Sequence, residues 1–259
     1  TWTDFSQLAE NLTVTEGGRT VVSGAAIGGI DNVDNFGDII GLLVAQSNLQ
    51  LPRDLDSEAM VNIISFYTGF LSKGVWSERQ DNSILSFANS KTAMVFGTSR
   101  DILKIINQNP SLRFRVASVP QLPSNEGLTS TNIANYWVDI VNPHSKNFNE
   151  SWEFLIWLSK NEQQKKFYSN VSKSKPFGDI YSTLSLKDDS DITSNTYILP
   201  LSKNAEYAYS NFLVSNAGNE IFINLLKDVM RESLRSSSKL KESLTSAKAD
   251  WNKIIKNGL

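Results

Sequence analysis

The sequence contains no cysteine and only one histidine, His144. These absences exclude disulfide bonds, zinc–thiolate centres, cysteine nucleophiles and clusters of histidine ligands. A Ser-His-Asp triad would have to use His144, which lies in the turn signal Asn142-Pro143-His144-Ser145 and is interpreted as a solvated loop residue. The sequence therefore predicts no metal site and no nucleophilic triad.

Clustered charge and long apolar runs are also missing. Lys and Arg are scattered and the net charge is −2, which argues against a nucleic-acid surface and an anionic membrane as partners. No apolar run approaches the ~18 residues of a membrane span. The signatures G-x-x-x-x-G-K-[ST], G-x-G-x-x-G and G-x-S-x-G are absent. We therefore expect no cofactor, and no catalytic residue is assigned.

The chain opens on Thr1-Trp2-Thr3-Asp4-Phe5, without a starting Met and without a signal peptide. We expect the natural N-terminus to lie upstream, so that no targeting segment reveals the location. A chain of 259 residues with 40 % hydrophobic and 20 % charged residues can bury one or two cores without disulfides.

Hydrophobic periodicity predicts an α/β protein. Helices are expected near residues 3–12, 36–47, 57–71, 83–89, 100–107, 150–158 and 162–170, and two long helices near 221–230 and 240–255 close the chain. Strands are expected at residues 20–27, 92–96, 114–119 and 136–141, with a crossing loop at 122–132 and a surface loop at 172–196. Trp152 and Trp157 fall in a nearly all-apolar helix and are expected in the core.

Polar and aromatic side chains gather after the predicted strands, where open α/β sheets bind their ligands. The candidates form three groups: Asn32, Asp34, Asn35 and Phe36; then Thr98, Ser99 and Arg100; then Asn135, Tyr136 and Trp137. Amides, carboxylates and Arg pair with vicinal hydroxyls while an aromatic face covers a sugar ring, so the mixture favours a sugar site. Structural alternatives stay open: residues 32–35 cap the next helix, Arg100 forms a surface ion pair, and Trp137 lies in the core.

Paired carboxylates of a glycosidase are an alternative, because any two of the many Asp and Glu residues can meet in space. The acidic run at residues 189–195 has oxygen side chains at alternating positions but lacks the Gly and Glu of a calcium loop, which favours a solvated loop. A carbohydrate-active hydrolase is therefore the rival function, and an interaction module without a small ligand is a third.

Taken in order, several motifs resemble the extracellular solute-binding proteins of sugar ABC importers, the group that includes maltose-binding proteins. The resembling segments are residues 1–5, 32–36 with Asp38-Ile39, 87 with 91–97, 119–123, 135–137, 152–155 and 162–167. Their order and spacing extend over nearly the whole chain.

The resemblance implies a two-lobe periplasmic-binding-protein-like fold, with a sugar bound in the cleft between the lobes. Residues 1–125 would form the second lobe, 126–198 the returning part of the first lobe, and 199–259 closing helices on the second lobe. The start of the first lobe would be missing. The protein would be a non-catalytic carrier that delivers a sugar or oligosaccharide to the membrane subunits of an ABC importer.

The resemblance also implies an extracellular or periplasmic location, with membrane attachment only through a lipid anchor absent from this chain. Members often carry an aromatic residue after the strand that ends here at Gly97, and this chain has Thr98-Ser99-Arg100 instead. That difference leaves room for an acidic or modified sugar. Phe222 would supply the aromatic residue that is common near the start of the penultimate helix.

Overall fold

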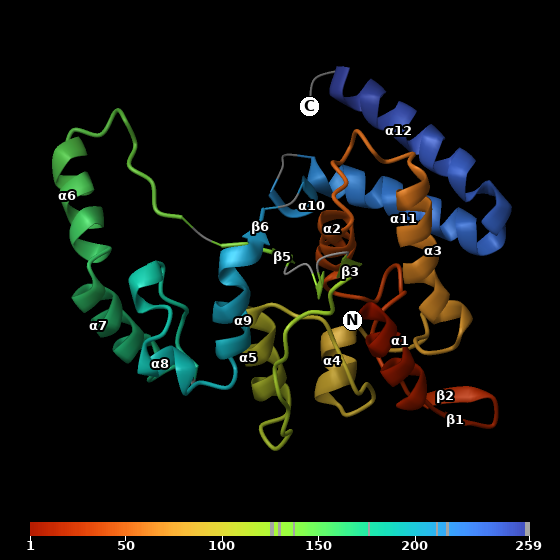
Figure 1. The fold of residues 1–259 in the computed structure, drawn as a ribbon, viewed down its shortest axis with the longest axis horizontal. Coiled ribbons are helices and arrows are strands. Elements are labelled where there is room, and N and C mark those ends of the chain that lie inside the picture. The colour runs from red at the N-terminus through yellow and green to blue at the C-terminus, as the bar shows by residue number, and fades with distance from the viewer. Residues whose placement is uncertain are drawn as a thin grey trace. The chain divides into compact units, whose positions relative to one another are not determined.

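The computed structural model describes residues 1–124, 127–128, 131–136, 138–175, 177–210, 212–215 and 218–256. The chain forms two units (Figure 1). Unit 1 comprises Thr1–Arg113, Val119–Ala134 and Tyr207–Leu259, and unit 2 comprises Phe114–Ser118 and Asn135–Glu206. The chain passes between the units after residues 113, 118, 134 and 206, whereas the limits predicted for the lobes are residues 125 and 198. Which unit corresponds to which lobe stays a prediction.

Helices dominate both units, and every strand is short. The elements are, in chain order, α1 (Trp2–Asn11), β1 (Val14–Glu16), β2 (Arg19–Val22), α2 (Phe36–Gln46), α3 (Glu58–Ser72), α4 (Ser83–Ala88), α5 (Ser99–Gln108), β3 (Pro123–Ser124), β4 (Gly127–Leu128), β5 (Asn132–Ile133), α6 (Phe148–Leu158), α7 (Asn161–Val171), η1 (Leu184–Leu186), α8 (Ser190–Thr193), α9 (Leu199–Asn204), η2 (Ala205–Tyr207), β6 (Ala208–Tyr209), α10 (Phe212–Ser215), α11 (Asn219–Arg235), η3 (Ser237–Lys239) and α12 (Leu240–Lys256). Among the residues described, every helix falls short of the length or the apolar character that a membrane crossing requires.

A parallel pairing of two extended segments lies at the centre of unit 1. Isolated parallel bridges join Ser23 to Thr92 and Ala26 to Val95. The Ala26 N–H donates to the Met94 carbonyl at 2.9 Å. The predicted strands at residues 20–27 and 92–96 therefore lie side by side, although only residues 19–22 belong to a named strand, β2, which pairs antiparallel with β1.

The amphipathic helices of unit 1 supply its core. The predicted stripes on α3, α11 and α12 are buried over most of their length, whereas Ile221 and Ile255 of the same stripes are exposed. The buried members are Met60, Ile63, Ile64, Tyr67 and Phe70; Phe222, Leu226, Val229 and Met230; Leu240, Leu244, Ala247 and Trp251. Figure 1 shows α11 and α12 packed along each other in this unit. Each buried large apolar side chain stabilises the fold by about 1.5–3 kcal/mol, which explains why these periodic segments were predictable.

Two predicted strands are wrong. Residues 114–119 form no strand, and neither do residues 136 and 138–141, the described part of the other segment. Both segments are rich in aromatic and β-branched residues, but a strand also needs a partner ladder, which composition does not supply. The predicted surface loop at 172–196 contains two short helical turns, η1 and α8.

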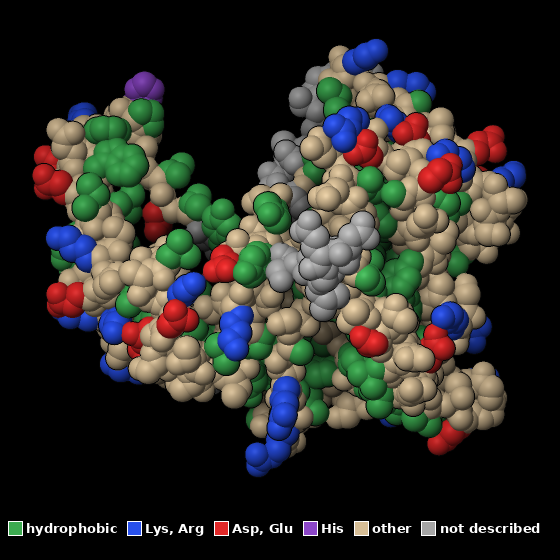
Figure 2. Space-filling view, viewed as in Figure 1, with side chains coloured by type: hydrophobic (Ala, Val, Ile, Leu, Met, Phe, Trp, Pro, Cys, Tyr) green, Lys and Arg blue, Asp and Glu red, His purple; other side chains and the backbone are tan. Residues whose placement is uncertain are grey.

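The predicted burial of Trp152 and Trp157 is also wrong. Each ring is 46 % exposed, and α6 contains no buried residue. Phe154, Ile156 and other large side chains on and near α6 are exposed as well. Figure 2 shows hydrophobic side chains gathered over this part of unit 2. Such an apolar surface attracts partners from solution.

We therefore expect the 259-residue chain to self-associate as its concentration rises, and to bind a hydrophobic dye. Replacing Trp152 and Trp157 together with Gln removes two large apolar contacts and shifts the equilibrium towards monomer in sedimentation velocity. Glu150→Gln with Glu153→Gln on the same helix is the matched control, because it changes charge without removing apolar area. If the parent chain and the Trp152/Trp157 double variant were both monomeric at every concentration, the expectation would be contradicted.

Candidate functional site

Two loops of unit 1 meet where the parallel segments end. The Asn35 side-chain amide donates to the Phe96 carbonyl at 3.1 Å and to Asp101 Oδ2 at 3.2 Å. The prediction that the loops at Asn32 and Thr98 lie at the same edge is thereby confirmed. Their contact with a ligand stays a prediction.

The second loop is ordered by a helix cap. Thr98 is the N-cap of α5, and its backbone N–H and its hydroxyl donate to Asp101 Oδ2 at 2.9 and 3.0 Å. The Lys104 ammonium donates to Asp101 Oδ1 at 2.8 Å. Ser99 begins α5 half-buried and Arg100 follows it exposed. The cap therefore fixes the direction in which these two side chains leave the helix.

The first loop is held by its own amide side chain. Asn32 Nδ2 donates to the Ser77 and Gln80 carbonyls at 2.9 and 3.2 Å, and Asn32 Oδ1 accepts from Trp76 Nε1 at 2.8 Å. The Tyr67 hydroxyl donates to the Gly29 carbonyl at 2.6 Å. Asn32 therefore fixes the loop, and both polar atoms of its side chain are already occupied.

Gly28 gives this loop its sharp start. Its φ of +97° is disfavoured for residues with a side chain, and a Cβ there would come within 2.9 Å of the Tyr67 carbonyl oxygen. Only glycine therefore allows the chain to pass this close to α3.

Asp34 caps a helix, but not the one predicted. Its Oδ2 accepts from the Ser83 hydroxyl and from the Ile84 N–H, both at 2.9 Å, at the start of α4. Asn35 is the N-cap of α2 by position and makes no capping bond with its side chain. Asp34 and Lys104 line a hollow of about 270 Å³, together with the apolar residues Ile84, Leu85 and Ala88.

Phe36 and Phe222 are core residues of unit 1, and their burial does not favour the predicted contact with a ligand. Phe36 is 3 % exposed and meets the Tyr67 ring edge-on at 5.5 Å. Phe222 is fully buried, with its ring centroid 5.0 Å from those of both Phe212 and Trp251. Neither ring presents a face to solvent on which a sugar could stack.

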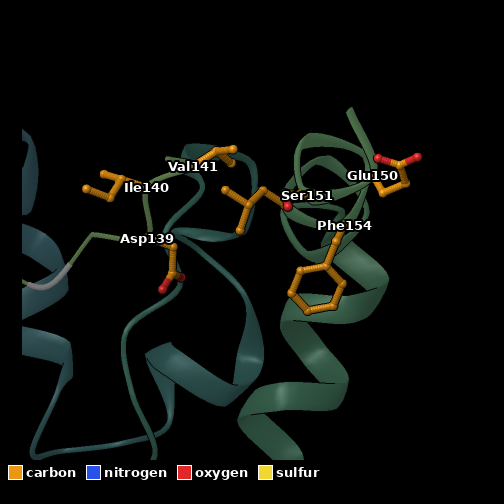
Figure 3. A pocket seen from close by; sticks show the side chains of 7 residues that line it. Asp139, Ile140, Val141, Glu150, Ser151 and Phe154 are labelled. Atoms are coloured by element: carbon orange, nitrogen blue, oxygen red, sulfur yellow. The ribbon is translucent and has the colours of Figure 1, made fainter. Parts of the chain in front are cut away.

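The third predicted group belongs to unit 2. Asn135 and Tyr136 are exposed, Tyr136 by 68 %, and Trp137 lies outside the described residues. A hollow of about 450 Å³ lies just beyond them in the chain, between residues 139–141 and α6 (Figure 3). Asp139 and Glu150 both line it, but Figure 3 shows their carboxylates pointing in different directions. They do not form a converging acid pair.

Asp38 was not among the predicted site residues. It lies on the first turn of α2, half-buried, and makes no hydrogen bond to a residue that the structure describes. Burial raises the pKa of the Asp38 carboxyl, and the negative charge of Asp101 raises it further. Its position in the sequence, two residues after Phe36, gave no sign of this environment.

The pKa of the neighbouring Asp101 is shifted in the opposite direction, to below its ordinary value. Burial acts to raise its pKa, but hydrogen bonds from Lys104, Thr98 and Asn35 outweigh burial and hold the pKa below the ordinary value of 3.8. Perturbed carboxylates of this kind concentrate at functional sites, although ion-pair networks also produce them. Among the described residues, no group of three or more His, Asp or Glu side chains is arranged to hold a metal ion.

Comparison with known proteins identifies similar chains. A sequence profile described as bacterial extracellular solute-binding protein matches residues 1–196. No curated protein matches the chain. The maltose/maltodextrin-binding domain MalE from Bdellovibrio bacteriovorus, bound to maltotriose, is similar with a TM-score of 0.62 at 15 % identity over 98 % of this chain and 66 % of that one.

Two further solved structures are similar. The sugar-binding protein MalE from Xanthomonas citri has a TM-score of 0.67 at 16 % identity over 99 % of this chain and 65 % of that one. CpMnBP1 with mannobiose bound has a TM-score of 0.61 at 16 % identity over 96 % of this chain and 63 % of that one. The chain therefore spans just under two thirds of the length of these structures, and at such low identity the likeness concerns the fold.

Proposed function

The chain belongs to the family of bacterial extracellular solute-binding proteins, and on that premise we propose that it binds a sugar and delivers it to an ABC importer. The observation that carries the proposal is the junction of the two loops through Asn35 and Asp101. Three structures of similar fold are described as sugar-binding or hold maltotriose or mannobiose.

The residues around this junction divide into two roles. Asn32, Asp34, Asn35 and Asp101 use their polar atoms on other parts of unit 1, so they position the loops. Asp38, Ser99 and Arg100 lie near the same junction, and we assign to them the hydrogen bonds to sugar hydroxyls. Carboxylate, hydroxyl and guanidinium groups are the side chains that pair with vicinal hydroxyls. Arg100 also provides the charge that an acidic sugar would require.

Asn135 and Tyr136 of unit 2, and the predicted stacking on Trp137, remain part of the proposal as ligand contacts. An exposed tyrosine ring is able to cover the C–H face of a sugar. Ligand contacts from both units would favour a closed state over an open one, so closure is a population shift. The partners in this proposal are the membrane subunits of the importer. Attachment of the complete protein by a lipid anchor also belongs to the proposal.

The arrangement of the carboxylates supports a non-catalytic carrier rather than the alternative function of a hydrolase. Asp101 accepts hydrogen bonds from three side chains and one backbone N–H, so proton transfer at its oxygens would disrupt the start of α5. A glycosidase needs two carboxylates that flank one bond. Asp139 and Glu150, which line the hollow in unit 2, point apart (Figure 3).

The substitution Asp38→Asn tests whether Asp38 binds the sugar, because it should raise stability at pH 7 and weaken sugar binding. The raised pKa of Asp38 means that the folded state favours the protonated form. The stability that Asp38 contributes is therefore present at low pH and is lost as pH rises from the ordinary value of 3.8 through the raised value. We expect the variant to melt at a higher temperature than the parent at pH 7, and at the same temperature near pH 3.

In the complete natural protein, Asp38→Asn should weaken sugar binding by about tenfold to a hundredfold, because a bond to a charged group contributes about 1.5–3 kcal/mol. Calorimetric titration with maltotriose and mannobiose measures this change. Asp81→Asn, at an exposed position, is the matched control. Unchanged affinity together with unchanged stability would remove Asp38 from the site.

A further inference from the structure

Gln46 is a buried amide at the end of α2, and each of its polar atoms is bonded to a different part of the chain. The residue is only 8 % exposed. Its Oε1 accepts from Trp2 Nε1 at 2.7 Å, and its Nε2 donates to the Pro120 carbonyl at 2.8 Å and to the Thr131 carbonyl at 3.2 Å. One side chain thus joins α1, α2 and two further segments within unit 1.

The two carbonyls lie close to the places where the chain passes between the units. The chain enters unit 1 at Val119 and leaves it after Ala134. Pro120 directly follows the first of these points, and Thr131 precedes the second by one short strand, β5. Gln46 therefore holds the unit 1 ends of both connections.

A second amide reinforces the same pair of segments. Gln121 Nε2 donates to the Thr131 carbonyl at 3.0 Å, and Gln121 Oε1 accepts from the Thr131 N–H at 2.9 Å. The Trp2 backbone N–H donates to the Gln121 carbonyl at 3.3 Å. The two connections are thus bonded to each other as well as to the core.

The connection at Tyr207 is bonded to the same group of segments as Gln46, Gln121 and Thr131. The chain returns to unit 1 at Tyr207, and β6 then pairs in parallel with β5. The Ala134 N–H donates to the Tyr209 carbonyl at 2.9 Å. Three of the four connections, those at Val119, Ala134 and Tyr207, therefore leave unit 1 from one bonded cluster, and Gln46 is a buried polar member of that cluster.

We infer that Gln46 is a positioning residue for the movement between the units, since it fixes the unit 1 ends of the connections at Val119 and Ala134 as a pivot. The inference rests on the proposed function, in which ligand drives closure. A buried amide suits this task because its donors and acceptor have fixed directions, and breaking them leaves buried carbonyls without partners. Bending then occurs beyond the cluster rather than within it.

The test uses the absence of cysteine, which allows two spin labels to be placed without a background signal. Lys239→Cys labels unit 1 and Lys173→Cys labels unit 2, and both positions are exposed. Pulsed electron spin resonance gives the distribution of distances between the labels in the complete protein. Gln46→Glu retains an acceptor for Trp2 but replaces the donor towards Pro120 and Thr131 with an oxygen.

We expect Gln46→Glu to lose the narrow distance distribution of the parent at pH 8. At lower pH the Gln46→Glu variant should recover part of the narrow distribution, because a protonated Glu side chain again has one hydrogen-bond donor. The Thr131 N–H donates to Gln121 Oε1 in the same cluster. Its hydrogen exchange should become about tenfold faster or more, because the cluster loses one or two hydrogen bonds of Gln46. Gln46→Met, which removes all three bonds in a side chain of similar size, should broaden the distribution at every pH.

Thr68→Val is the matched control, because the buried Thr68 hydroxyl bonds only within its own helix, to the Ile64 carbonyl. It should lower stability without broadening the distribution. Equal widths in the parent, Gln46→Glu and Gln46→Met would overturn the inference. A parent whose distances do not shift with maltotriose or mannobiose would instead count against the proposed closure, and the comparison of widths would still decide the role of Gln46.

Discussion

Replacing Phe222 with Ala should lower the free energy of unfolding by about 3–5 kcal/mol, the largest effect that we expect from a single substitution. The ring is fully buried between Phe212 and Trp251, so its removal loses apolar burial and leaves a cavity that the rigid neighbours cannot fill. The melting temperature should fall by roughly 10 °C. Thermal unfolding followed by circular dichroism measures both quantities.

The neighbour Ile221 provides the matched control for this experiment. It lies on the same helix and is 42 % exposed, so Ile221→Ala should change stability by no more than about 0.5 kcal/mol. Sugar affinity per folded molecule should be the same for Phe222→Ala as for the parent. Loss of affinity without loss of stability would show that Phe222 contacts the ligand after all.

Asp101→Asn should have the second largest effect, a loss of about 2–3 kcal/mol at pH 7, because it removes charged hydrogen bonds at a buried position. The lowered pKa sets the pH dependence. The contribution of Asp101 is present above the ordinary value of 3.8 and is lost as pH falls through the lowered value. The melting temperatures of parent and variant should therefore converge as the pH falls below the lowered pKa of Asp101.

The same substitution should weaken sugar binding, because Asp101 joins the loop at Asn35 to the start of α5. Asp54→Asn is the control: Asp54 pairs with Arg53, which lowers its pKa to about 2, but the pair lies at the surface where solvent screens it. A stability difference at pH 7 that persists unchanged at low pH would show that the Asp101 carboxylate is not the cause.

The sequence predicted burial correctly where the spacing of apolar residues within a single helix defines its buried face. Helices α3, α11 and α12 carry apolar residues at three- and four-residue spacing, and the structure buries most of them, although Ile221 and Ile255 are exposed. The adjacency of the loops at Asn32 and Thr98 was also predictable, because each follows an extended segment and parallel segments end at one edge.

The sequence was a poor guide where the outcome depends on a distant partner. The environment of Asp38 is created by Asp101, which lies on another helix. The amide of Asn32 is occupied by residues 76, 77 and 80, which no local pattern links to it. Trp152 was predicted to be buried because its helix is apolar, but it is exposed. An apolar helix face gains stability when other residues pack on it, but its composition does not show whether this chain contains those residues.

The most direct test of the proposed carrier is to titrate the complete protein with maltotriose and mannobiose and to analyse the same samples for products. We expect saturable, reversible binding, a higher melting temperature with ligand, and full recovery of the intact sugar. Asp38→Asn should lower the affinity in that titration, and Asp81→Asn should not. Release of shorter sugars would contradict the proposal and establish the hydrolase, and neither binding nor turnover with neutral and acidic sugars would leave only the interaction module.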